Sequence, residues 1–225
     1  IFGFFESRAK HPILNMDLIK SNRILTFSSL AALINYSATA AISYLLSLYL
    51  QYIKGFDPSY AGFILIAQPA VMALFSPIAG RLSDKIESQK VASLGMALTA
   101  LGLAFFIFLS ESTGTAYIIA GLLVIGFGFS LFSSPNTNAV MSSVEKRYYG
   151  VTSGILGAAR TVGQALSMGI TSLILAIYLG NAQIKGSNLP DFLIAVRVTF
   201  IILTILCFTG IFASIARGKS KTARP

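Results

Sequence analysis

GRLSDKIESQK, residues 80–90, is a dense charged stretch between two long apolar runs. No charged residue occurs at positions 58–80 before it or at positions 91–110 after it. At a rise of about 1.5 Å per residue, either run is long enough as a helix to cross a hydrocarbon core roughly 30 Å thick. The stretch therefore predicts a tight turn at a membrane surface that joins two membrane-spanning helices.

The composition indicates that the chain is embedded in a lipid bilayer. Hydrophobic residues make up 55% of the 225 residues, charged residues make up 11%, and the mean hydropathy is +0.75. These values lie outside the usual range of soluble globular domains. The net charge of +9 does not favour nucleic acid as a partner, because the basic residues stand between apolar runs and not along one helix face with interleaved aromatic residues.

The residues that most enzymes and metal proteins need are scarce. The chain has one cysteine, Cys207, and one histidine, His11, so it can form neither an internal disulfide nor a Cys or His metal cluster. No nucleophile–base pair and no glycine-rich phosphate loop stands out in the sequence. We therefore expect a protein that is not an enzyme and that holds no metal or other cofactor.

Apolar runs separated by short polar links predict an all-α membrane protein with one six-helix transmembrane domain, residues 24–217. Residues 1–23 are interpreted as the end of a truncated preceding helix and a cytoplasmic basic linker, and residues 218–225 as a cytoplasmic basic tail. The six predicted spans are residues 24–53, 58–80, 91–110, 115–134, 148–178 and 192–216.

The basic residues predict how these spans are oriented. Thirteen of the 17 Lys and Arg residues fall at one set of helix ends, whereas only Lys54 and Lys185 fall at the other; Arg160 and Arg197 lie within spans. Membrane proteins keep their Lys-rich and Arg-rich loops in the cytoplasm. The sequence therefore predicts a multi-pass protein of the cell membrane with both ends of this chain in the cytoplasm.

Several short motifs resemble those of a known family. The sequence Gly-x-Leu-Ser-Asp-Lys at residues 80–85 is similar to the cytoplasmic loop motif of the major facilitator superfamily, although Glu87 and Ser88 stand where that motif has Gly and a basic residue. Other stretches resemble the fourteen-helix drug:proton antiporters of that superfamily. They are Tyr49-Leu50-Gln51, Gly55-Phe56-Asp57-Pro58, Ala61-Gly62, Ser76-Pro77-x-x-Gly80, Pro135-Asn136-Thr137-Asn138, and Gly150-Val151-x-Ser153-Gly154 with Arg160 and Gly163.

This resemblance implies the C-terminal six-helix half of a secondary transporter, built as two inverted three-helix units. It implies a missing N-terminal half as the partner, a small lipophilic substrate and a proton as the coupling ion. The loop residues Gly80, Arg81, Asp84 and Lys85 would then hold the cytoplasmic side closed in one state, with Asp84 complementing the positive end of the next helix. The alternative is that these charges only fix the topology.

Polar residues in the first span are candidates for a substrate path. Asn35, Thr39, Ser43 and Ser47 recur every four residues and predict one polar stripe on a helix. Aromatic residues accompany them: Tyr36 and Tyr44 in the same span, and Phe129 in the fourth. Such a surface suits lipophilic molecules, but small polar residues are also common where membrane helices touch each other.

The fifth span combines a deep charge with a run of small residues. Arg160 is the one charge far inside a span, and it needs either a functional or a structural partner there. Gly150, Ser153, Gly154 and Gly157 predict a surface for a close helix neighbour.

None of the eight acidic residues lies in the middle of a span, although proton coupling needs a group that titrates along a protected pathway. A proton carrier is therefore expected in the missing half, and the 225 residues alone are not expected to transport. A membrane-embedded binding or assembly protein without transport activity remains the alternative.

Overall fold

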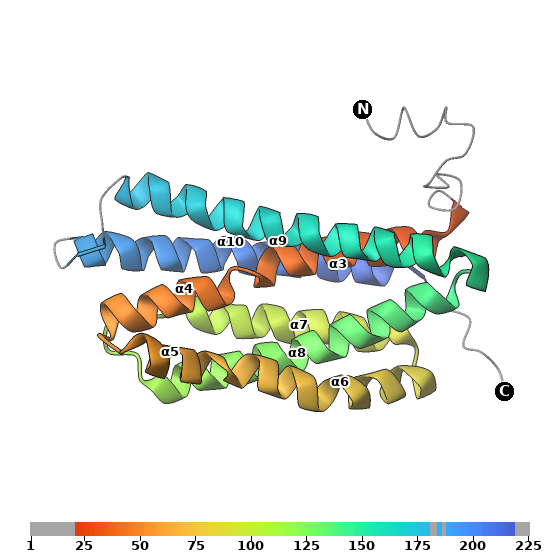
Figure 1. Ribbon diagram of the computed structural model, residues 1–225, viewed down its shortest axis with the longest axis horizontal. Helices are drawn as coiled ribbons and strands as arrows, with labels where there is room; N and C mark the ends of the chain where they lie inside the picture. Colours follow the sequence, from red (N-terminus) through yellow and green to blue (C-terminus); the bar gives the residue numbers. More distant parts are fainter. Residues whose placement is uncertain (1–20, 181–183, 186–187, 219–225) are drawn as a thin grey trace.

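Six membrane-length helices run side by side along the molecule (Figure 1). The computed structural model describes residues 21–180, 184–185 and 188–218, so most of the predicted basic linker and tail lies outside the described residues. No β-strand occurs in the described parts of the chain, and the predicted all-α class with six spans is confirmed. The helices are α3 (Arg23–Thr39), α4 (Ile42–Leu48), a π-helical turn η1 (Tyr49–Ile53), α5 (Pro58–Leu65), α6 (Ala67–Lys85), α7 (Ser88–Ile107), α8 (Thr115–Ser142), a short 3₁₀ turn η2 (Lys146–Tyr148), α9 (Tyr149–Leu179) and α10 (Leu189–Ala216).

Two helices extend beyond the ends of the predicted spans, because the helix continues after the apolar segment has ended. Helix α6 runs through the charged motif to Lys85, and α8 continues to Ser142, eight residues beyond the predicted end of the fourth span. Charge density marks where a segment leaves the hydrocarbon, whereas the helix stops only where its backbone hydrogen bonds stop. These helices therefore extend past the apolar segments that identified them.

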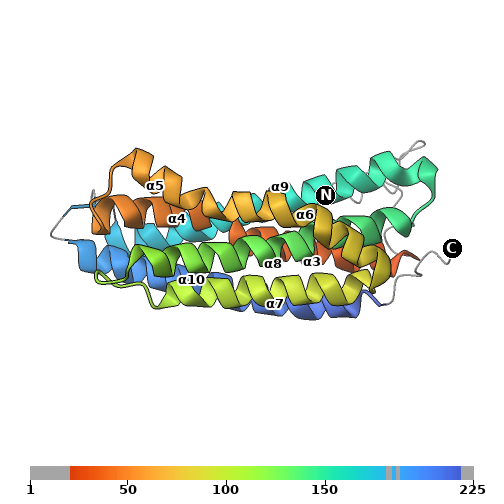
Figure 2. The ribbon, with the colours of Figure 1, turned by 90° about the horizontal axis from the view of Figure 1, so that it is seen from below.

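The packing has an internal two-fold relationship. Helix α3 packs on α9 and α10, α8 packs on α6 and α7, and α7 packs on α10. Exchanging the first three spans with the last three maps the contacts of α3 onto those of α8 and maps the α7–α10 contact onto itself. Figure 2 shows α7 and α10 along one edge of the bundle and α6 and α9 along the opposite edge. Helices α3 and α8 are therefore the two central helices.

Close helix crossings depend on glycine at specific positions. A Cβ atom added at Gly163 of α9 would lie 2.5 Å from the backbone oxygen of Leu33 in α3. At the crossing of α7 and α8, a Cβ at Gly95 would lie 2.6 Å from the oxygen of Gly128. Side chains cannot occupy these positions without moving the helices apart, so glycine sets the helix spacing here.

The first span is broken between α3 and α4 without a proline. The hydroxyls of Ser37 and Thr39 donate to the carbonyls of Leu33 and Asn35 in the preceding turn, a bond that often bends helices. The backbone N–H of Ala41 donates to Ser167 Oγ of α9 at 3.0 Å. A neighbouring helix thus satisfies a backbone donor at the break.

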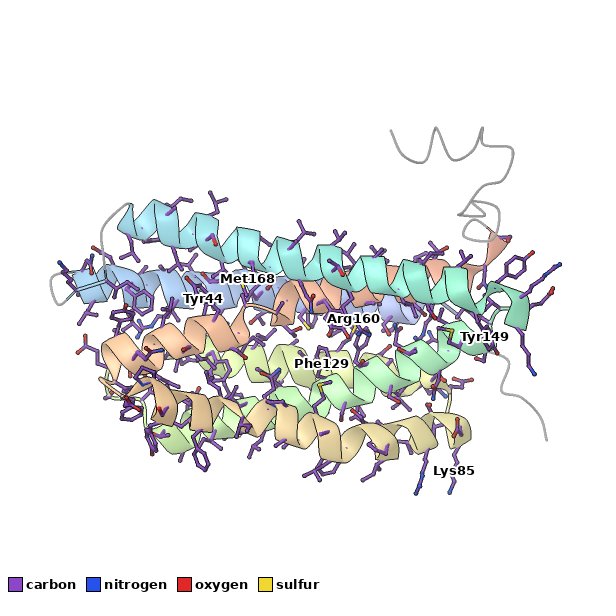
Figure 3. The ribbon with its side chains drawn as sticks, in the orientation of Figure 1. Tyr44, Lys85, Phe129, Tyr149, Arg160 and Met168 are labelled. Atoms are coloured by element: carbon purple, nitrogen blue, oxygen red, sulfur yellow. The ribbon has the colours of Figure 1, made fainter. Side chains whose placement is uncertain are left out.

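Hydrogen bonds from side chains to backbone carbonyls link the helices at both ends of the bundle. At the end that carries Lys85 and Tyr149, which we call the basic end (Figure 3), Arg23 Nε donates to the carbonyl of Ala216 and Asn22 Nδ2 to that of Ser143. At the opposite end, three consecutive carbonyls of the α7–α8 loop accept hydrogen bonds from side chains of other spans. The pairs are Arg197 Nε to Leu109, the Tyr49 hydroxyl to Ser110, and Lys54 Nζ to Glu111.

Candidate functional site

An aromatic and cationic surface lies halfway along the bundle, where α3 is exposed between α8 and α9. The partly exposed ring of Tyr36 meets the ring of Phe129 edge to face, with 5.3 Å between their centres and 79° between their planes, and Phe129 itself is buried. The guanidinium carbon of Arg160 lies 5.0 Å from the centre of the Tyr36 ring, within the range of a cation–π contact. The two central helices α3 and α8 and the edge helix α9 thus bring together one predicted residue each, and we call these three residues the central cluster.

Arg160 projects from α9 into the space between α9 and α8 (Figure 3). Its side chain is exposed, and within the described part of the chain it forms no hydrogen bond and no ion pair. A guanidinium carries five N–H donors and keeps its charge under all ordinary conditions. The Tyr36 ring therefore satisfies only the face of this cation and leaves its edge free to bind an acceptor.

The space beneath the central cluster is narrow. A cavity of about 10 Å³ lies between Arg160, Tyr36 and the side chains of Ser133 and Asn136, which is room for one water molecule. A larger molecule can therefore reach Arg160 only from the open side of the bundle. The hydroxyls of Tyr36 and Ser133 have no hydrogen-bond partner among the described residues.

A larger groove lies between α4 and α9 toward the opposite end. Its volume is about 320 Å³, which is in the range of small-molecule sites. Its walls are mostly aliphatic, with the exposed ring of Tyr44 on one side and the hydroxyl of Ser172 on the other. This groove could accommodate a lipophilic molecule with few polar groups.

The predicted polar stripe of the first span is divided between the interior and the open surface. Asn35 and Thr39 are buried, whereas Ser43 and Tyr44 are exposed and Tyr36 is half-buried. Residues four apart in a helix drift by about 40° per step, and the break after Thr39 redirects the rest of the span. The amide of Asn35 is fully buried and neither its oxygen nor its nitrogen has a hydrogen-bond partner. Of this set, Ser43 and Tyr44 are exposed, and Tyr36 and Ser47 are partly exposed, with Ser47 Oγ accepting a hydrogen bond from Gln51 Nε2.

The loop motif lies at the basic end, with its charges pointing outward. Asp84 lies in the last turn of α6, and the residue preceding α7 at its N-cap is Glu87, which pairs with Lys90 at 3.1 Å. Asp84 was expected to complement the positive end of the next helix. Within this chain that expectation is wrong, because Asp84 still lies inside α6 and Glu87 occupies the N-cap of α7. Arg81, Asp84 and Lys85 are exposed and form no ion pair within the described residues.

The uncharged residues of the same motif hold α6 against α8. A Cβ atom at Gly80 would lie 3.0 Å from Ser134 Oγ, so glycine permits this close approach. The buried hydroxyl of Ser83 donates to the Gly80 carbonyl at 2.7 Å and accepts from Asn138 Nδ2 at 3.2 Å. Ser83 was not among the predicted site residues, although its place in the motif could have indicated it.

The small-residue run of α9 has no neighbour within the described chain. Nothing lies within 4 Å of a Cβ atom built at Gly150, Gly154 or Gly157. The predicted close helix neighbour is therefore not provided by the described residues. The run belongs to one of the two most exposed spans: only 22% of the most apolar part of Lys146–Leu179 and 11% of that of Pro58–Lys85 is buried, against 44–61% in the other four.

Arg217 is a buried cation, one of the thirteen basic residues that the sequence placed at one set of helix ends. Only 2% of it is exposed, and its guanidinium donates to Asn136 Oδ1 at 2.9 Å, to Ser28 Oγ at 3.3 Å and to the carbonyl of Ser88. Burial lowers the pKa of Arg217 to about 10, so it remains charged at neutral pH. It joins α3, α7 and α8 to the end of α10, and no feature of the sequence distinguishes it from the neighbouring tail charges.

The described residues contain no group of three His, Cys, Asp or Glu side chains that could hold a metal ion. Their arrangement suits noncovalent binding: an apolar and aromatic surface with one free cation and a few hydroxyls.

Comparison with known proteins agrees with this architecture. A family model described as the Major Facilitator Superfamily matches residues 28–225. Two solved structures have the same fold over 90% of this chain. One is a bacterial homologue of the human drug peptide transporters PepT1 and PepT2, with a TM-score of 0.74 and 21% identity over 45% of its chain. The other is tetrameric PepTSo2, with a TM-score of 0.72 and 23% identity over 44% of its chain.

Curated relatives include proteins named as transporters and resistance proteins. The riboflavin transporter RibZ of Clostridioides difficile is 27% identical over 210 residues, which is 93% of this chain and 46% of RibZ. The multidrug resistance protein Stp of Mycobacterium tuberculosis is 27% identical over 180 residues, 80% of this chain and 33% of Stp. The tetracenomycin C resistance and export protein of Streptomyces glaucescens is 23% identical over 84% of this chain and 36% of its own length. The chain thus spans half or less of the length of these relatives.

Proposed function

Since the chain belongs to the Major Facilitator Superfamily, we propose that it is the C-terminal half of a secondary transporter that exports lipophilic small molecules in exchange for protons. The observation that carries this proposal is the central cluster: the exposed cation of Arg160 beside the partly exposed Tyr36 ring, which the buried Phe129 supports, midway along a bundle of apolar helices. The relatives named for multidrug resistance and tetracenomycin C export favour efflux. A rocking motion of two halves around such a surface would give alternating access.

The partner would be a second six-helix half that covers α6 and α9. These spans bury the least of their apolar surface within the chain, and a run of glycines on α9 leaves room for close contact with another helix. The central cluster faces the space between α8 and α9 and would then be enclosed between the halves. The same arrangement accounts for a chain that spans half or less of its relatives.

The basic end is proposed to face the cytoplasm of a cell membrane, because Lys and Arg are retained on that side. In this orientation the exposed Arg81, Asp84 and Lys85 would pair with groups of the second half and hold the cytoplasmic side closed. Their lack of ion pairs within the described residues supports this role. Gly80 and Ser83 would keep the motif at a fixed distance from α8.

The coupling proton would be carried by the second half. The acidic residues that the structure describes lie at or beyond the ends of the spanning helices and not in their middle; they are Asp57, Asp84, Glu87, Glu111, Glu145 and Asp191. A carboxylate in contact with bulk water at all times cannot couple proton entry to substrate exit.

Reconstitution into vesicles tests the proposal. The 225-residue chain alone is expected to give no concentrative flux of a lipophilic fluorescent dye under a pH gradient. The same chain joined to the complementary half of its parent protein is expected to give flux that collapses when the gradient is dissipated. Concentrative flux by the chain alone would contradict the half-transporter proposal. Dye binding without flux by the joined protein would favour the alternative, a membrane-embedded binding or assembly protein, which the open faces of α6 and α9 also fit.

A further inference from the structure

Arg160 carries a positive charge at a depth where charge is costly. It lies 11 residues into α9, which is about 17 Å from the start of the helix at the usual rise. Because α9 has 31 residues and is about 46 Å long, its ends project from a hydrocarbon core of roughly 30 Å. Arg160 therefore lies inside the core, where an isolated cation is retained only if it faces protein or water and has a partner.

Other described arginines have an acceptor within the chain. Arg197 and Arg23 each donate to a carbonyl at a helix end, Arg147 pairs with Glu145 at 2.9 Å, and Arg217 binds three acceptors. Arg81 has none but lies exposed at the basic end, where water can solvate it. Arg160 thus lies deep in its span, and its N–H groups donate to no acceptor among the described residues.

The surroundings of Arg160 suit an anion attached to an aromatic body. A carboxylate accepts two parallel hydrogen bonds from a guanidinium, and the Tyr36 and Ser133 hydroxyls nearby have no described partner. The partly exposed ring of Tyr36, held edge to face against the buried Phe129, offers an aromatic surface directly beside the cation. The narrow cavity below leaves approach from the open side only.

We propose that Arg160 binds the carboxylate of the transported molecule, and that substrates therefore include amphipathic aromatic anions, not only neutral lipophilic compounds. This inference rests on the proposed transport function, because it assigns the substrate class of the same surface. The partly exposed ring of Tyr36 contacts the aromatic body, the buried ring of Phe129 supports Tyr36 from behind, and Arg160 binds the carboxylate.

Binding of 2-naphthoate and its neutral analogue 2-naphthamide tests this assignment without requiring transport. The chain contains no tryptophan, so naphthalene fluorescence can be followed with the full chain in phosphatidylcholine nanodiscs, with empty nanodiscs subtracted. Wild type is expected to bind naphthoate about tenfold more tightly than naphthamide, as a charge-assisted hydrogen-bonded pair would give. Arg160→Gln is expected to abolish this preference, Arg160→Lys to keep part of it, and Arg147→Gln, which removes an exposed arginine, to leave it unchanged.

Equal binding of the two probes by wild type, or a preference that survives Arg160→Gln, would overturn the assignment. A preference present in the chain alone but lost when the complementary half is joined would also overturn it, because a carboxylate of that half would then be the partner of Arg160. A joined protein that keeps the preference but gives no flux of any substrate would contradict the transport proposal and leave the anion site standing.

Discussion

Ser167 Oγ of α9 accepts a hydrogen bond of 3.0 Å from the backbone N–H of Ala41. This bond is made where the first span breaks between α3 and α4. Because Ala41 and Ser167 are both fully buried, the loss of the acceptor leaves a buried donor unsatisfied.

Ser167→Ala is therefore expected to destabilise the protein by about 1 kcal/mol. Thr171→Val, one turn further along α9, is the matched control: the Thr171 hydroxyl is fully buried and has no hydrogen-bond partner, so its removal should be neutral or stabilising. Thermal unfolding in detergent measures both changes. Equal loss of stability in the two variants would mean that the Ala41–Ser167 bond contributes nothing specific.

Gly163→Ala is expected to destabilise the contact between α9 and α3 by roughly 1–3 kcal/mol. The new methyl group would lie 2.5 Å from the Leu33 carbonyl oxygen, so the helices must separate. Gly169→Ala serves as the control, because nothing lies within 4 Å of its Cβ position. Urea or SDS unfolding of the two variants should differ; a Gly163→Ala protein as stable as wild type would show that α3 and α9 are not in close contact.

Replacement of Arg217 is expected to destabilise the basic end. Arg217→Met keeps much of the side-chain volume but leaves Asn136 Oδ1 and the Ser88 carbonyl without their donor, which should cost roughly 2–4 kcal/mol. Arg147→Met, at an exposed arginine of the same end, should change stability little. Thermal unfolding compares them, and similar melting temperatures for the two variants would contradict the joining role assigned to Arg217.

Asp84→Asn is expected to slow transport by the joined protein without preventing membrane insertion, because it removes the charge proposed to pair with the second half. Glu145→Gln, which neutralises another exposed carboxylate at the basic end, is the control and should leave the rate unchanged. Initial rates in vesicles with equal amounts of inserted protein give the measurement. An unchanged rate for Asp84→Asn would leave these charges with a topological role only.

The number of spans and the all-α class could be predicted from the sequence alone. The cost of placing each residue in hydrocarbon accumulates along the chain, so runs such as residues 58–80 identify membrane helices without knowledge of their neighbours. The short motifs around Gly80 and Arg160 likewise indicated the family that the comparison identified. Helix ends were less predictable, as the extension of α8 to Ser142 shows.

Which polar groups are buried was decided only by the tertiary structure. Asn35 and Tyr36 are adjacent in the sequence. Asn35 is fully buried inside the bundle, whereas Tyr36 contacts the guanidinium of Arg160 on the open side. In the sequence Arg217 was one of thirteen basic residues at one set of helix ends, whereas in the structure it is buried and links four helices. Hydropathy is a property of each residue and can be summed along the chain, whereas the face that a helix presents depends on neighbours distant in sequence and on crossings such as that of Gly163 with Leu33.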